Sequence, residues 1–255
     1  MINKQRIDLI EQYIRDHQYA DLHTLAKEFD ISLSTVRRAL NELEAKKLVR
    51  RHHGGASLID NEINAIGYDF ITQDDRYVDE KHAIAKYIAN FVEPNMTVIL
   101  DGGTTTYTVA RLLVSKRIIV ITNSLPIAVL FNEISSMETI VTGGTVYHRL
   151  GVLLGPTCEN SLSQMHADIA ILGGAGLTEE GIWNSNSFIV SAQKKILRAA
   201  DKGIFAIDYS KFGKRALELT TPFKSDFMVV TNAKPEPRLN RAMRAAGTEF
   251  IITPC

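Results

Sequence analysis

The chain has few cysteines, no net charge and no long apolar run. Its 255 residues include only two cysteines, which rules out a disulfide framework and gives no metal-binding spacing. The 29 basic and 29 acidic residues balance, so the chain is not a polycationic nucleic-acid coat. No uninterrupted apolar stretch approaches the roughly 20 residues that span a bilayer, and residues 1–6 lack the apolar core of a signal sequence. We expect a soluble, cytoplasmic protein that has no membrane partner, metal or cofactor.

Basic charge is instead concentrated in one short region. Over residues 33–56 there are six lysines and arginines but two glutamates, a local net charge of +4. Val36, Leu40 and Leu43 recur there at the spacing of one helical face. The polar residues of the opposite face and its flanks are Ser34, Thr35, Arg37, Arg38 and Asn41. Because arginine binds guanine edges or phosphates and asparagine reads adenine, we predict a DNA-recognition helix.

The preceding residues predict the rest of a helix-turn-helix. Ile7, Ile10 and Ile14 are spaced as on an amphipathic first helix, and apolar residues within 22–29 indicate a short second one. Ser32 then suits the N-cap of the recognition helix, because its hydroxyl can accept a hydrogen bond from a backbone amide of the first turn.

The residues after the recognition helix indicate a basic hairpin, or wing. Residues 48–51 are typical of a strand, and two glycines at 54–55 bend the chain back. An arginine pair alone usually marks only a solvated face, and a glycine pair alone only a turn. Their order and spacing here favour a winged helix-turn-helix domain over residues 1–58, in which Arg50, Arg51 and His53 add DNA contacts.

The remainder predicts an acidic linker and a second domain. Residues 59–79 lack sustained periodicity and are taken as the linker. Beyond it, apolar strands alternate with helical patterns. The expected strands are residues 97–100, 118–121, 139–141, 168–172, 204–207 and 228–230, and the clearest helices are 107–113, 126–131, 190–200 and 237–246. This alternation predicts an α/β domain over residues 80–255 with a mainly parallel sheet covered on both faces.

Polar clusters follow several of these strands. They are residues 101–106, 122–124, 142–145, 173–176 and 208–213. Any one of them alone is more often an ordinary turn, but ligands of such sheets bind at the carboxyl ends of the strands, where all five converge. The first cluster has glycines and three threonines at the start of a helix, which suits an anion, although it has neither a P-loop ending nor a GxGxxG pattern. We therefore predict a site for a small polar ligand.

The segment SLSTVRRAL at 32–40, its spacing to RHHGGA at 51–56 and the strand-end motifs resemble the DeoR family of bacterial transcriptional regulators. The resemblance covers almost the whole chain. It implies an effector domain similar in fold to ribose-5-phosphate isomerase, which senses a sugar phosphate or a related metabolite. The effector-binding residues it implies are Asp101, Gly102, Gly103, Thr104, Thr105, Thr106, Asn123, Gly143, Gly144, Asp208 and Lys211. Asn123 would bond a sugar hydroxyl, and Lys211 would pair with the anion.

Two places differ from the family pattern. Ala39 stands where the family usually has an acidic residue, so we expect altered helix packing or arginine orientation. Phe188 and Ile189 stand where many members are acidic. We expect that second change to suit a different sugar, or an effector that is not a simple sugar phosphate.

Two functions of different classes fit these residues. The first is a regulator, most simply a repressor of a carbohydrate-metabolism operon, that binds double-stranded operator DNA. Because two recognition helices must lie roughly 34 Å or a multiple apart, we expect a homo-oligomer, a dimer or a tetramer. The alternative is a sugar-phosphate isomerase that carries a DNA-binding domain, with Asp101, Asp208 and Lys211 moving protons. No pairing in the sequence specifies a catalytic base, so we expect a regulator rather than an enzyme.

Overall fold

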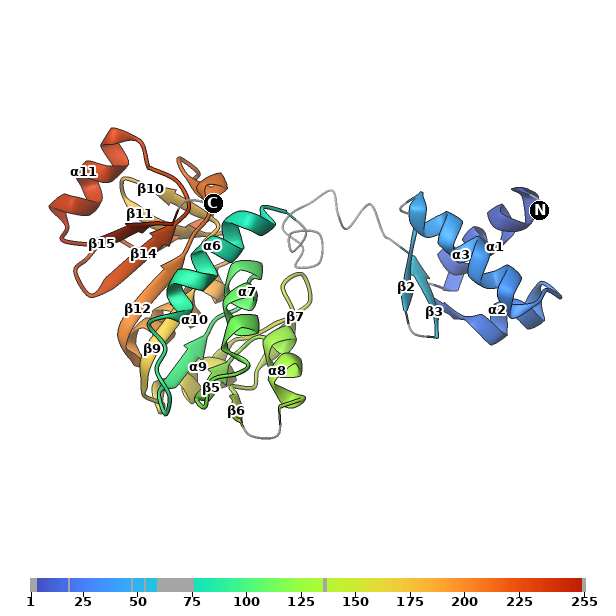
Figure 1. Ribbon diagram of the computed structural model, residues 1–255, viewed down its shortest axis with the longest axis horizontal. Helices are drawn as coiled ribbons and strands as arrows, with labels where there is room; N and C mark the ends of the chain where they lie inside the picture. The colour runs from blue at the N-terminus through green and yellow to red at the C-terminus, as the bar shows by residue number, and fades with distance from the viewer. Residues whose placement is uncertain are drawn as a thin grey trace. The chain divides into compact units, whose positions relative to one another are not determined.

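The computed structural model describes residues 4–17, 19–46, 48–52, 54–58, 76–134 and 137–253. The chain forms two compact units, Met1–Gly67 and Tyr68–Cys255 (Figure 1). Within the described ranges no helix is long and apolar enough to cross a bilayer. The predicted fold class, a small helix-turn-helix region followed by a larger α/β domain, is confirmed.

The N-terminal unit combines three helices with a small antiparallel sheet. Its described elements are α1 (Lys4–His17), β1 (Tyr19–Asp21), α2 (Leu22–Glu28), α3 (Leu33–Ala45), β2 (Val49–His52) and β3 (Gly55–Leu58). The sheet order is β1-β3-β2, so β3 lies in the middle. Strands β2 and β3 form the predicted hairpin, and β1 pairs with β3 as a strand that the sequence analysis does not predict.

Buried apolar side chains of all three helices meet in one core. The largest contributors are Ile7, Ile10 and Ile14 of α1, Leu25 of α2 and Val36, Leu40 and Leu43 of α3. Ala39 is also fully buried in this core. Ser32 caps α3 as predicted, because its hydroxyl accepts a hydrogen bond from the Thr35 amide at 3.2 Å.

The C-terminal unit is built on a seven-stranded parallel sheet. Its strands are β4 (Thr97–Leu100), β5 (Ile119–Thr122), β6 (Glu138–Val141), β9 (Ala167–Leu172), β12 (Ala200–Ala206), β14 (Phe227–Thr231) and β15 (Glu249–Ile252). Their order is β15-β14-β12-β9-β4-β5-β6. The first of these seven strands along the chain, β4, therefore lies inside the sheet, with the chain continuing on one side and later crossing to the other. In parallel sheets this reversal leaves a crevice at the carboxyl ends of the two strands concerned, here β4 and β9.

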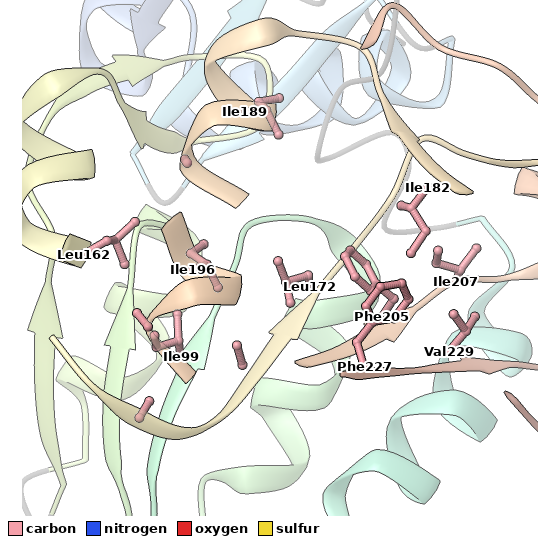
Figure 2. Close-up of a cluster of buried hydrophobic side chains, with 14 of the residues drawn as sticks. Ile99, Leu162, Leu172, Ile182, Ile189, Ile196, Phe205, Ile207, Phe227 and Val229 are labelled. Atoms are coloured by element: carbon pink, nitrogen blue, oxygen red, sulfur yellow. The ribbon is translucent and has the colours of Figure 1, made fainter. Parts of the chain in front are cut away.

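Helices cover both faces of the sheet, as the sequence predicts. They are α6 (Val78–Ala89), α7 (Thr104–Leu113), α8 (Leu125–Asn132), α9 (Pro156–Ser163), α10 (Ser187–Arg198) and α11 (Pro237–Ala245). Residues of α6, α7 and α8 share one buried cluster with Val98 and Leu100 of β4. Ile99, which points to the opposite face, joins residues of α9, α10 and α11 in the second cluster. Figure 2 shows Ile99 in this cluster with Leu162 of α9 and Ile196 of α10.

Shorter strands complete the unit. A hairpin joins β7 (Thr145–Tyr147) to β8 (Val152–Leu154), and a second small sheet has the order β10 (Gly176–Thr178), β11 (Gly181–Asn184) and β13 (Glu218–Thr221). After β12 the chain makes a 3-10 turn, η1 (Tyr209–Lys211). None of these short strands is predicted from the sequence, and neither are α9 and β15.

Candidate functional site

The outer face of α3 is polar and exposed. Ser34, Arg37, Arg38 and Asn41 are exposed and Thr35 is half-buried, whereas the apolar residues between them face the core. The structure therefore brings the five predicted contact residues of this helix onto its solvent side.

The hairpin is attached to this face through Arg51. The Arg51 guanidinium of β2 donates a hydrogen bond to Asn41 Oδ1, and the Arg51 backbone amide donates to Glu44 Oε1 at 3.0 Å. Two residues that the sequence assigns to DNA binding thus hold each other in place. Arg50 lies in the same strand, and His53 lies outside the described residues.

A cavity opens at the carboxyl ends of the sheet strands in the C-terminal unit. It encloses about 620 Å³, a figure that counts its open mouth and the solvent space there. Nine of the eleven predicted effector residues line it, namely Asp101, Gly102, Gly103, Thr104, Thr105, Thr106, Asn123, Asp208 and Lys211. These residues follow β4, β5 and β12, and residues 173–175 after β9 lie among them.

The other two predicted residues, Gly143 and Gly144, do not line the cavity. Gly144 has a φ of 126°, and a Cβ built on it would lie 2.7 Å from the Leu154 carbonyl oxygen. The neighbouring Thr142 donates a hydrogen bond to Cys158 Sγ at 3.4 Å. This part of the chain therefore packs β8 and α9 beside the end of β6.

Gln193, which lines the cavity, is not predicted from the sequence. Gln193 of α10 is 1% exposed, and its Nε2 donates to Asp101 Oδ2 at 2.6 Å and to the Gly173 carbonyl at 3.0 Å. Its Oε1 accepts from Asn184 Nδ2 at 3.0 Å and from Thr220 Oγ1 at 3.1 Å. An amide has two donor hydrogens and two acceptor positions, so all four are used. A polar residue on the apolar face of an amphipathic helix, between Ile189 and Ile196, is the signal that would have found it.

Asp101 is a buried carboxyl group with an altered pKa. It is 3% exposed, and burial raises its pKa to about 6. Hydrogen bonds from Gln193 and Asn123 and from the backbone of Gly102 and Gly173 oppose that rise. The carboxyl group therefore changes charge close to neutral pH.

Asn123 has an unused acceptor. It is 1% exposed; its Nδ2 donates weakly to the Leu153 carbonyl at 3.4 Å, and its Oδ1 has no hydrogen-bond partner. A buried acceptor without a partner costs about 1–3 kcal/mol. A hydroxyl group of a ligand in the cavity would remove that cost.

The start of α7 is a part of the cavity wall that favours a negatively charged group. Gly103 is the N-cap residue, with a φ of 129° and no side-chain capping bond. The first turn of any helix has amides that the helix cannot satisfy, and its dipole favours an anion. Lys211 of η1 also lines the cavity, and burial lowers its pKa while the Asp208 charge raises it. The cavity thus combines a side whose charge and helix dipole favour an anion with a side that has hydrogen-bond acceptors.

Family models match both units. The model of the DeoR-like helix-turn-helix domain matches residues 6–62, and that of the DeoR C terminal sensor domain matches residues 76–233. The chain belongs to the DeoR family. It is thus a DNA-binding transcriptional regulator, and its predicted family membership is confirmed.

DeoR-family relatives match along most of their length. The chain is 33% identical over 214 residues to the L-fucose operon activator of Haemophilus influenzae, covering 83% of this chain and 85% of the relative. It is 29% identical over 237 residues to the glycerol-3-phosphate regulon repressor of Escherichia coli, covering 92% and 93%. One of these relatives is thus named as an activator and the other as a repressor.

Among solved structures, ribose 5-phosphate isomerase A from Neisseria gonorrhoeae aligns with a TM-score of 0.39 at 16% identity, covering 53% of each chain. A structural similarity this distant gives no information about activity. The family and the relatives do not support the isomerase alternative. Within the described ranges, no group of three or more His, Cys, Asp or Glu residues is placed to hold a metal ion.

Proposed function

We propose that this DeoR-family regulator binds operator DNA through α3 and the β2–β3 hairpin, and that a phosphorylated sugar or polyol in the cavity controls that binding. One observation supports this effector class: the cavity has two kinds of wall. The start of α7 and Lys211 favour an anion, and Asp101 and Asn123 can accept hydrogen bonds from hydroxyl groups. Ile189 lines the same cavity, so its apolar side chain faces the bound compound, whereas exposed Phe188 is not part of the lining.

The effector would control DNA binding through thermodynamic linkage between the two binding sites. A compound that binds one arrangement of the protein better than another shifts DNA affinity by that difference, typically about 1–3 kcal/mol. A homo-oligomer in the cytoplasm belongs to the same proposal, since two recognition helices must meet successive turns of chromosomal DNA. Repression of a carbohydrate operon stays the prediction made from the sequence.

Arg38→Ala should weaken operator binding without unfolding either domain. Its side chain is exposed on α3, and loss of one arginine contact to DNA costs about 1–3 kcal/mol, or roughly 5-fold to 150-fold in Kd. The measurement is a titration at fixed salt of a genomic fragment selected by the purified wild-type protein. Arg111→Ala, which removes an exposed arginine from α7, is the control. Unchanged affinity of the Arg38 variant would remove this residue from the DNA contacts.

A thermal-shift screen should identify the effector class. Sugar phosphates, free sugars, polyols and sugar acids are compared, and a compound at 100 times its Kd adds about 2.7 kcal/mol of stability. We expect phosphorylated compounds to give the largest rise in Tm, and Lys211→Gln to reduce that rise. Lys234→Gln, at an exposed lysine outside the cavity, should not reduce it. A response to free sugars alone would contradict the phosphate assignment.

A further inference from the structure

The chain enters α6 in an unusual backbone conformation. Tyr77, the N-cap residue, has φ 55° and ψ 43°, the left-handed region that bulky residues rarely adopt. No side-chain bond caps the helix there. Such a conformation persists only where the surrounding structure holds it. The Tyr77 ring packs edge-on against that of Tyr209, with centroids 5.5 Å apart and an interplanar angle of 82°.

Tyr209 belongs to the turn that carries two cavity residues. The 3-10 turn η1 begins after Asp208, whose Oδ1 accepts a hydrogen bond from the Ser210 amide at 2.9 Å. It ends at Lys211, and both Asp208 and Lys211 line the cavity. The Tyr209 amide donates to Asn232 Oδ1 at 2.9 Å, which holds the turn against the segment after β14. One short turn therefore lies between the cavity and the start of α6.

Two cations, Lys214 and Arg76, act on the charge of Lys211 in this turn. Burial is the main cause of the lowered Lys211 pKa; the Asp208 charge opposes it, and the charges of Lys214 and Arg76 lower the pKa further. Arg76 directly precedes Tyr77 and is exposed. A dianionic phosphate bound at Lys211 would relieve this repulsion between cations, and would attract Arg76 as well.

We propose that Arg76 is a further binding residue for the anionic group of the effector, and that the Tyr77–Tyr209 contact relays occupancy of the cavity to the segment that joins the two domains. This inference rests on the proposed function, because it assumes an anion at Lys211. Residues 59–75 connect Arg76 to the DNA-binding domain along the chain, so a change at Arg76 acts on the one covalent connection between the sensor and the DNA reader.

The first test measures the affinity of the full chain for inorganic phosphate by isothermal titration calorimetry at constant ionic strength. Arg76→Gln should weaken phosphate binding about fivefold, the scale of an exposed ion pair, and Lys211→Gln should weaken it more. Arg238→Gln, at an exposed arginine on α11, is the matched control. Unchanged affinity in Arg76→Gln with loss in Lys211→Gln overturns the role of Arg76 and leaves the proposed function standing. Unchanged affinity in both variants, or no binding to wild type, counts against the proposed anion site itself.

The second test follows hydrogen exchange of the peptide at the start of α6. Saturating inorganic phosphate should slow exchange of this peptide several-fold in the wild type and in Tyr209→Phe, which keeps the ring contact. In Tyr209→Ala the slowing should disappear while calorimetry still detects phosphate. Equal slowing in Tyr209→Ala, or no slowing in the wild type at saturation, overturns the relay.

Discussion

Asp101→Asn should stabilise the C-terminal domain above pH 6. Asp101 in the folded protein has a pKa of about 6, against an ordinary value of 3.8. Between these values the folded state binds more protons than the unfolded chain, so the free energy of unfolding falls as pH rises through that window. At neutral pH the free energy of unfolding is therefore about 3 kcal/mol lower than it is below pH 3.8 from this group alone. Asparagine does not ionise and keeps an oxygen for Gln193, but its amide nitrogen cannot accept from the other donors around Asp101. We therefore expect only part of this loss to be recovered, a gain of about 1–2 kcal/mol at pH 8.

The single tryptophan gives a probe of this domain alone. Trp183 lies in β11, where its Nε1 donates to Thr178 Oγ1 at 2.8 Å. Urea unfolding followed by its fluorescence at pH 4 and pH 8 should show a difference between wild type and Asp101→Asn at the higher pH only. Asp226→Asn, at an exposed carboxylate, should follow the wild type. A wild-type stability that does not fall between these pH values would contradict the raised pKa.

The same substitution should weaken effector binding. Hydrogen bonds to a charged group contribute about 1.5–3 kcal/mol, so we expect a loss of roughly 10-fold to 100-fold in affinity for the compound found in the screen. A variant that is more stable and binds less well would show that the buried carboxylate is kept for binding and not for folding.

Gln193→Leu should destabilise the C-terminal domain by about 3–5 kcal/mol. Leucine has a similar size but removes four hydrogen bonds at once. The buried Asn184 amide and Thr220 hydroxyl lose this acceptor, the Gly173 carbonyl loses this donor, and Asp101 loses one of its several donors. Each buried group left without a partner costs about 1–3 kcal/mol, and partial rearrangement reduces the sum.

Urea unfolding by Trp183 fluorescence measures this loss as well. The control is Gln164→Leu, which changes an exposed glutamine at the end of α9 and should shift stability by less than about 0.5 kcal/mol. If Gln193→Leu cost no more than this control, the network would contribute little to the fold.

The central strands and their helices were predictable because apolar runs and helical spacing have a direct physical cause. Strand β4 begins and ends at the predicted residues, and α7 starts three residues earlier than its apolar pattern because the threonines of its first turn are polar. The strands of the second small sheet escape prediction because three or four residues give too little alternation to recognise.

The candidate site was predictable where it follows the strand ends, and much less so elsewhere. Asp101 and Asp208 come directly after apolar strands, so their convergence follows from the parallel sheet. Gln193 is 92 residues from the carboxylate that it contacts, and only the packing of α10 brings the two together. Gly143 was placed by the same strand-end rule, yet β6 is an edge strand, separated by β5 from the crevice beside β4.

The hydrogen-bond network around Gln193 also means that the sensor domain is completed later than the DNA-binding domain during protein synthesis. The DNA-binding domain needs only about the first sixty residues of the chain, whereas the network closes only when Thr220 has left the ribosome. At about 5–20 residues per second, the intervening 160 or so residues take roughly 8–30 s to make. For that interval a nascent chain has a complete DNA reader and an unfinished sensor.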